Sequence, residues 1–268
     1  MNHLLRPLAP MSDAGWEMLD EEARERLVPA LAARKLIDFS GPHGWEYSAT
    51  NLGRASGIGA APCAGVAGSQ RRVLPLVELR ASFTVALEEL RAADRGAEDA
   101  DLEELDRAAH QIAVAENKTV FHGWSEASIA GIAEVSPHDR IPLGQDANDY
   151  PRLVASAVER LLHNGVEGPY ALALGGEQYK RVAETAEHGG YPLRDHLRKI
   201  LDGPIVWAPG VAGAVVLSTR GGDFLFECGQ DLSIGYESHD GEVVRLYLEE
   251  SISFRVATPE AAVTLAAA

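Results

Sequence analysis

The residues TRGGDF (219–224) and CGQDLSIGY (228–236) form the most informative stretch of this 268-residue chain. Gly and Asp adopt the backbone angles of tight turns more readily than other residues, so the stretch predicts short strands separated by turns at residues 220–223 and 229–231. It contains no nucleophile–base pair and no metal-ligand spacing. This combination favours a protein whose function is built from surfaces rather than from a catalytic centre.

The regions on both sides of this stretch predict an α+β fold, because helical and strand patterns do not alternate regularly. Apolar residues recur at helical spacing from residue 13 into the thirties and over 101–118, and Pro29 is expected to kink or split the first helix near Val28. The longest predicted strand spans 244–256 and has Glu250 on its apolar side, which implies an edge position or an arginine partner. Residues 261–268 read as a poorly ordered tail.

Residues 45–83 predict a long two-stranded arm. Strand-like alternation at 45–50 and 71–83 flanks a glycine-rich tract, 53–68, which reads as a flexible tip. An isolated hairpin is only marginally stable in water. The arm therefore implies a neighbour, either in the same chain or in another subunit.

The composition excludes several function classes. With 24 Lys and Arg against 40 Asp and Glu, the net charge is −16, which disfavours nucleic acid as a partner. Two cysteines, Cys63 and Cys228, stand far apart and in no motif, so a disulfide framework or structural zinc is not expected and a reducing cytoplasm fits. There is no signal-peptide layout and no apolar run long enough to cross a bilayer, so no membrane association is expected.

Motifs that approach catalytic signatures are incomplete. GIGAAP (57–62) lacks the third glycine of a dinucleotide loop, and GWSEA (123–127) ends in Ala where a nucleophile elbow has Gly. The nine histidines form no His-Glu-x-x-His motif. We therefore predict no catalytic residue, no metal site and no cofactor, and interpret the chain as not being an enzyme.

Motifs spread over nearly the whole chain resemble the encapsulins, bacterial proteins that self-assemble into hollow icosahedral shells around cargo enzymes. Their order and spacing carry the resemblance more than any one of them does. The motifs are GP (41–42), GWEY (44–47), PL (75–76), ELR (78–80), FT (83–84), FHG (121–123), GPY (168–170), RGGDF (220–224) and GQDLSIGY (229–236).

The resemblance implies the fold of tailed-phage major capsid proteins. It divides the chain into an N-terminal arm and helix (1–43), an extended E-loop (44–80), a peripheral P-domain (81–135 and 229–268) and an axial A-domain (136–228). In relatives the E-loop pairs with a neighbouring subunit, which agrees with the arm predicted above. The junction of the two domains falls at the turn of residues 220–224.

The resemblance also implies a cargo-binding groove. In relatives, a short C-terminal targeting peptide of the cargo docks between the N-terminal helix and the P-domain. Apolar side chains would fill such a trough, while Arg34 and Asp38 would fix the polarity and register of the peptide. The alternative interpretation is ordinary packing of a helix on a sheet. The matching positions are Leu27, Ala30, Leu31, Arg34, Asp38, Leu232, Ile234 and Tyr236.

A second implied site is a pore at the five-fold axes that admits small molecules and ions. The matching pore positions are Glu184, Thr185, Glu187, His188, Gly189, Gly190 and Tyr191.

Some relatives bind a flavin through an aromatic residue shortly after the Phe83-Thr84 pair. No aromatic residue follows this pair here, so no flavin is expected.

The implied partners are 60 copies of the same chain and a cargo protein in the bacterial cytoplasm. Relatives hold dye-decolourising peroxidases or ferritin-like proteins, which act in oxidative stress or iron storage. A prophage or viral major capsid protein is the main alternative, disfavoured by the acidic charge and by the absence of a long N-terminal scaffolding segment. Older labels of the family, bacteriocin and peptidase, find no catalytic constellation in support.

Overall fold

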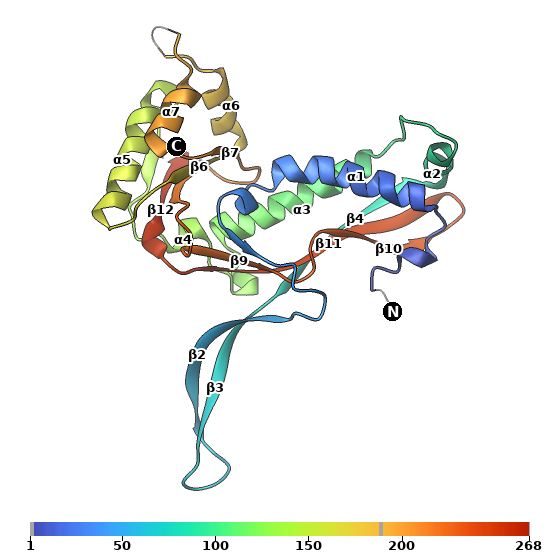
Figure 1. The fold of residues 1–268 in the computed structure, drawn as a ribbon, viewed down its shortest axis with the longest axis horizontal. Coiled ribbons are helices and arrows are strands. Elements are labelled where there is room, and N and C mark those ends of the chain that lie inside the picture. The colour runs from blue at the N-terminus through green and yellow to red at the C-terminus, as the bar shows by residue number, and fades with distance from the viewer. Residues whose placement is uncertain (1–2, 188–189, 268) are drawn as a thin grey trace.

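The protein consists of two bodies of packed helices and sheet and a hairpin arm that projects from their junction (Figure 1). The structure is a computed structural model that describes residues 3–187 and 190–267. Its helices are α1 (Asp13–Ala30), α2 (Leu87–Asp94), α3 (Glu103–His122), α4 (Ile132–Val135), α5 (Tyr150–His163), α6 (Gly176–Glu184) and α7 (Leu193–Leu201). Short 3-10 turns are η1 (Arg6–Leu8), η2 (Ala33–Lys35), η3 (Ser125–Ala127), η4 (Ala147–Asp149) and η5 (Pro259–Ala261).

The first body is organised around one long strand, β11 (Val243–Val256), which alternates apolar and polar side chains as the sequence predicts. The first part of β11 pairs antiparallel with β4 and β10, and its last residues pair with β9, which in turn pairs in parallel with β1. Helix α3 packs on β4 and β11, and α1 packs on α3. The other strands are β1 (Asp38–Ser40), β4 (Val77–Ala86), β9 (Phe224–Cys228) and β10 (Ser233–His239).

The second body has a five-stranded sheet of order β5-β12-β8-β6-β7. Helices α5, α6 and α7 pack against it, and every residue of its inner strands β6 and β8 is buried. The strands are β5 (Ile141–Leu143), β6 (Tyr170–Leu174), β7 (Ile205–Trp207), β8 (Ala214–Ser218) and β12 (Ala262–Ala267).

The chain end differs from the sequence prediction. Residues 262–267 form β12, which lies between β8 and β5 rather than trailing as a tail. Small apolar side chains suit this position, because Ala262, Val263 and Leu265 are fully buried within the sheet, and helices α4 and α5 pack against β12. Strand β12 thus joins the sheet of residues 136–228, although the resemblance assigns 229–268 to the other body.

The arm consists of β2 (Ala49–Ala60) and β3 (Ala67–Pro75), paired antiparallel. The glycine-rich tract was expected to be a flexible tip, but most of it is strand. The ladder shifts register between residues 51 and 54 and again between 57 and 60, and Gly53 and Gly59 have positive φ angles of 65° and 86° at these two shifts. These glycines therefore accommodate β-bulges, which bulkier residues would strain.

Helix α1 begins as the sequence indicates, because Ser12 Oγ accepts a hydrogen bond from the backbone N–H of Gly15 (3.0 Å). The expected split near Val28 does not occur, and α1 continues as one helix to Ala30. Pro29 lacks the N–H that would donate to Glu25 O, so α1 loses one hydrogen bond of its last turns. Leu31 N still donates to Leu27 O (2.9 Å), so the last turn is completed around the proline.

Candidate functional site: a groove between helix α1 and strand β10

A groove with a cavity of about 590 Å³ runs between α1, β10 and the N-terminal segment. Helix α1 and strand β10 supply its long walls, and β11 contributes to the floor. Most of the lining is apolar, and its charged side chains lie toward the two ends except for Arg24 on the helical wall. The lining residues are Leu4, Arg6, Asp20, Ala23, Arg24, Leu27, Val28, Leu31, Arg34, Asp231, Leu232, Ser233, Ile234 and Leu248.

Five of the eight positions named for cargo binding line this groove: Leu27, Leu31, Arg34, Leu232 and Ile234. They come from two segments about 200 residues apart in the sequence. Leu27 lies on α1, Leu31 caps the end of that helix and Arg34 lies in the following turn η2, while Leu232 and Ile234 stand two residues apart and so point to the same side of their strand segment.

The remaining three positions, Ala30, Asp38 and Tyr236, do not line this cavity. Ala30 is buried in the core, and the hydroxyl of Tyr236 is 2.5 Å from Nδ1 of His239. Asp38 Oδ2 accepts a hydrogen bond from Gly222 N (2.5 Å), so it holds the turn at the junction of the two bodies. Asp38 borders a separate hollow beside the groove, so its role in fixing the register of a bound peptide stays a prediction.

The N-terminal segment is a third wall that the sequence analysis missed. Tyr236 N donates to Leu4 O (2.8 Å), so residue 4 lies against the free edge of β10. Arg6 then crosses from strand to helix: Nε donates to Ile234 O (2.8 Å), and both Nη atoms bind the two carboxylate oxygens of Asp20 (2.8 and 2.5 Å). Its guanidinium also lies 4.5 Å from the ring centre of Trp16. Arg6 thereby closes one end of the groove.

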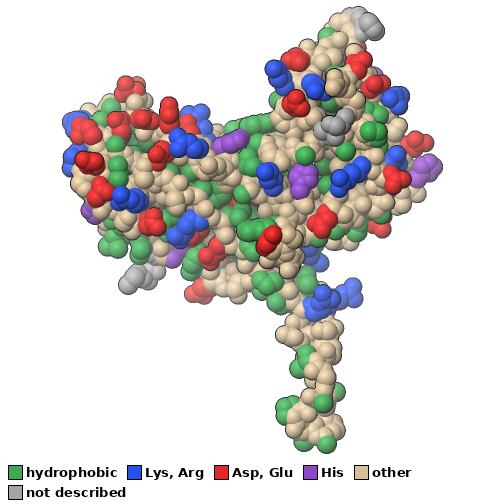
Figure 2. Space-filling model, turned by 180° about the vertical axis from the view of Figure 1, so that it is seen from behind, with side chains coloured by type: hydrophobic (Ala, Val, Ile, Leu, Met, Phe, Trp, Pro, Cys, Tyr) green, Lys and Arg blue, Asp and Glu red, His purple; other side chains and the backbone are tan. Residues whose placement is uncertain are grey.

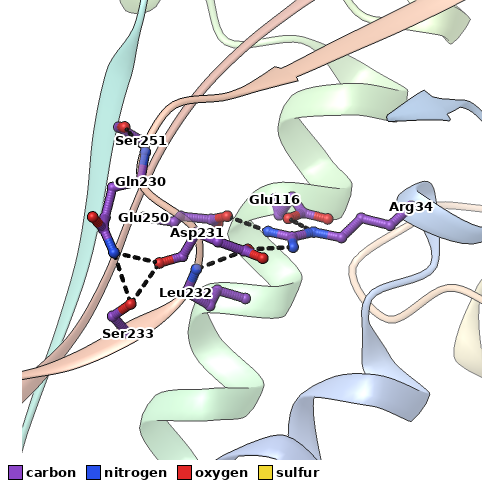
Figure 3. A network of polar contacts seen from close by, with 8 residues as sticks. All are labelled: Arg34, Glu116, Gln230, Asp231, Leu232, Ser233, Glu250 and Ser251. Carbon is purple, nitrogen blue, oxygen red and sulfur yellow. Dashed lines mark hydrogen bonds and ion pairs between the residues drawn. The ribbon is translucent and has the colours of Figure 1, made fainter. Parts of the chain in front are cut away.

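Arg34 closes the other end as the centre of a buried ion cluster (Figure 3). Its Nε donates to Oε2 of Glu116 in α3 and its Nη2 to Oε2 of Glu250 in β11, both at 2.6 Å. Its Nη1 donates to Oδ1 of Asp231, just before β10, at 2.7 Å. The arginine partner that the sequence predicted as one option for Glu250 is therefore Arg34, and the cluster ties three elements together.

The electrostatics of this cluster keep Arg34 charged. Burial lowers the pKa of Arg34, but the charges of Glu116 and Glu250 outweigh that effect and raise it well above its ordinary value. Burial raises the pKa of both carboxyls, and the charge of Glu116 raises that of Glu250 further. Oε1 of each carboxyl has no hydrogen-bond partner among the described residues.

The candidate pore segment lies at the far end of the second body, between α6 and α7. Glu187 Oε1 is 2.8 Å from Nδ1 of His196, and Lys199 Nζ lies 4.9 Å from the ring centre of Tyr191. Glu187 N also donates to Tyr191 O (2.8 Å), which closes the loop on itself. Glu184 ends α6, with Thr185 next along the chain and Gly190 at a positive φ. The predicted pore residues His188 and Gly189 lie outside the described residues.

Within residues 3–187 and 190–267, no group of three or more His, Cys, Asp and Glu side chains could hold a metal ion. Nor does any helix in this part of the chain have the length and apolarity needed to cross a membrane.

Comparison with solved structures places the fold among capsid subunits. The chain resembles the subunit of a virus-like particle from Pyrococcus furiosus, with a TM-score of 0.59 and 17% identity over 93% of this chain and 98% of that one. It also resembles the capsid subunit of an empty GTA particle, with a TM-score of 0.53 and 15% identity over 89% and 90% of the two chains. The predicted capsid-like α+β fold is confirmed.

Sequence comparison narrows the class to one family. A family model described as "Encapsulating protein for peroxidase" matches residues 1–253, and the chain belongs to that encapsulin family. Similar relatives are the type 1 encapsulin shell proteins of Rhodospirillum rubrum (47% identity, 99% of this chain, 96% of the relative) and Mycobacterium tuberculosis (42%, 99% of each). Proteins of this family build shells and are not enzymes, so the chain is a self-assembling structural subunit.

Proposed function

We propose that this protein assembles 60 copies of itself into an icosahedral nanocompartment in the bacterial cytoplasm and retains cargo enzymes by their C-terminal peptides. The observation that carries the proposal is the groove between α1 and β10, whose apolar lining and closed ends suit a short segment of chain. A peroxidase is the first cargo class to test because the family description names one. A ferritin-like protein is the second.

Each structural part of the subunit has a proposed role in the shell. The arm (44–80) would reach a neighbouring subunit, and the first body, which carries the groove, would form the peripheral domain. The second body would form the axial domain, with residues 184–191 at the five-fold pore that passes small molecules and ions. We assign β12 to the axial domain in this scheme, because it pairs with β8 and β5.

The first prediction concerns assembly. The purified chain of 28.7 kDa is expected to elute as closed particles of about 1.7 MDa, the mass of 60 copies. Mass photometry and negative-stain electron microscopy would measure mass and closure. A preparation that contains only monomers and dimers at neutral pH and moderate salt would refute the shell assignment.

The contents of the particles distinguish a cargo shell from a prophage capsid. The capsid is the alternative because capsid subunits share this fold. A cargo shell isolated from its native host is expected to retain protein, identified by mass spectrometry. Particles that retain DNA instead would favour the capsid.

The second prediction tests the groove with an exposed side chain. Val28 lines it and is 57% exposed, so Val28→Asp places a charge among apolar contacts at little cost to folding. We expect particles of this variant to form normally and to lose at least about tenfold of their cargo, since a bound apolar side chain would desolvate the new carboxylate, and since its pairing with Arg24, four residues earlier, would also withdraw that guanidinium. Cargo per particle is measured by quantitative mass spectrometry after co-expression.

Leu162→Asp is the matched control, because Leu162 is equally exposed, at 57%, on a helix that does not line the groove. It should retain full cargo. Ile234→Asp is a poorer probe because Ile234 is buried, and a charge there would disturb the sheet itself. Equal cargo in the Val28 and Leu162 variants would remove the groove assignment.

A further inference from the structure

Three arginines line the groove, and their contacts differ. Arg6 is bound to both oxygens of Asp20, and Arg34 is surrounded by Glu116, Asp231 and Glu250. Arg24 has no hydrogen bond, ion pair or aromatic contact among the described residues, although it borders the same cavity. The one lining cation without a partner therefore lies in the middle of the helical wall.

The isolation of Arg24 has a structural cause. Asp20 stands four residues before Arg24 on α1, the spacing from which a carboxylate ordinarily pairs with a following arginine. Here Arg6 occupies both oxygens of Asp20 and turns them toward the N-terminal segment. Glu21 and Glu25 share a shallow outer hollow with Arg24 but form no ion pair with it. The N-terminal segment thus leaves a free guanidinium beside the apolar trough.

We propose that Arg24 binds the terminal α-carboxylate of the cargo peptide. The inference rests on the proposed function, in which the groove holds a C-terminal tail. Such a tail carries one carboxylate whatever its sequence, and a guanidinium can bind it through two parallel hydrogen bonds. The bound tail would end at Arg24 and place its preceding apolar side chains between Leu27 and Leu232. The groove would in this way distinguish a chain end from an internal segment.

The test measures preference for a free chain end. The probe is a fluorescein-labelled peptide of the 15 C-terminal residues of the protein found in native particles, made with a free carboxylate and with a terminal amide. Subunits dissociated from cargo-free particles are reassembled with the peptide present, because a closed shell would keep a peptide of this size from a groove on its inner face, and binding is followed by fluorescence anisotropy. We expect the amide to bind about fivefold more weakly, the upper range for a partly exposed ion pair, and the difference to shrink as salt is raised.

In Arg24→Gln particles the two peptides are expected to bind equally, whereas Arg24→Lys should keep part of the difference. Arg107→Gln, an exposed arginine of α3 outside the groove, should leave the full preference. Equal affinity of both peptides for the wild type, or a preference that survives Arg24→Gln, would overturn the inference. A difference that instead follows a Glu or Asp side chain of the peptide would also overturn it.

The failure of the wider proposal looks different. If neither peptide binds wild-type particles, or if both bind Val28→Asp particles as well as wild type, the groove is not the cargo site and the role of Arg24 falls with it. If binding is lost in Val28→Asp particles but the wild type binds the free carboxylate and the amide equally, the groove is the cargo site and the proposed role of Arg24 is refuted.

Discussion

Replacing Arg34 with methionine is expected to lower the free energy of unfolding by about 3–5 kcal/mol, because it removes the cation between two buried carboxyls. Glu116 and Glu250 are completely buried, and each accepts a hydrogen bond from the guanidinium of Arg34. Without it, at least one must be protonated or hydrated inside the core. Methionine fills a similar volume, so the loss reports the charge rather than a cavity.

The thermal unfolding midpoint of purified particles, followed by circular dichroism, should fall by about 10 °C for a chain of this size. The triple variant Arg34→Met, Glu116→Gln, Glu250→Gln is expected to recover at least half of the loss, since it removes the uncompensated charge as well. Arg26→Ala is the control: Arg26 also has two carboxylate partners, Glu22 and Asp106, but lies in solvent, so its loss should barely shift the midpoint. A wild-type midpoint in Arg34→Met would refute the structural role of the cluster.

This result would show that Arg34 stabilises the fold, in addition to any contact it makes with cargo in the groove. The sequence resemblance presents Arg34 as a contact for cargo, and its place in the lining agrees with that. Its donors are nevertheless committed to the fold, and only 15% of its side chain is exposed. A cargo defect in an Arg34 variant would therefore be ambiguous between lost contact and lost packing, which is why Val28 and Arg24 are the better probes.

Local patterns predicted the apolar faces that line the groove, whereas the groove itself was implied only by the family resemblance. The helix face of Leu27 and Leu31 follows from 3.6-residue spacing, and the same spacing extends back to Asp20, Ala23 and Arg24, so those positions were within reach of sequence reasoning. The strand face of Leu232 and Ile234 follows from two-residue spacing. Which polar side chains remain free depends on contacts between distant segments, and no periodicity encodes them.

Arg6 and Asp38 illustrate that limit. Arg6 contacts a strand 228 residues away, and only the folded chain brings its guanidinium onto Asp20. Asp38 has the charge expected of a ligand-binding residue, yet its carboxylate serves a turn at residue 222. The tail of small residues failed as a prediction for a related reason: burial of β12 is decided by the gap between β8 and β5, which its own composition does not reveal.

Replacing residues 53–71 with an Asn-Gly turn is expected to abolish particle formation while leaving the subunit folded. Nearly every residue from 53 to 73 is exposed, including the apolar side chains of Ile58, Val66 and Val73, so the arm contributes little to the core of its own chain. Size-exclusion chromatography with light scattering should show single chains somewhat lighter than the 28.7 kDa of the full-length chain instead of particles. Circular dichroism should show a folded protein with one cooperative transition.

Charge indicates how the arm meets its neighbour. Arg54, Arg71 and Arg72 are the charged residues of 49–75. Figure 2 shows basic side chains near the base of the arm and no acidic side chain on the visible face of the arm. Arg54 stands directly opposite Arg72 in the ladder, an arrangement that destabilises an isolated hairpin. Because the whole chain carries −16 and the arm +3, the rest carries −19, and an acidic surface of a second copy would relieve the repulsion.

Arg54→Gln with Arg72→Gln separates this charge from the length of the arm. If the arginines meet an acidic neighbour, the variant should assemble only at higher protein concentration and should lose the sensitivity of wild-type assembly to salt. Arg54→Lys with Arg72→Lys keeps the charge and is expected to assemble as the wild type does. Improved assembly of the glutamine variant would mean that relief of repulsion within the hairpin outweighs any contact with a neighbour, and the arm would then act through its length and apolar side chains alone.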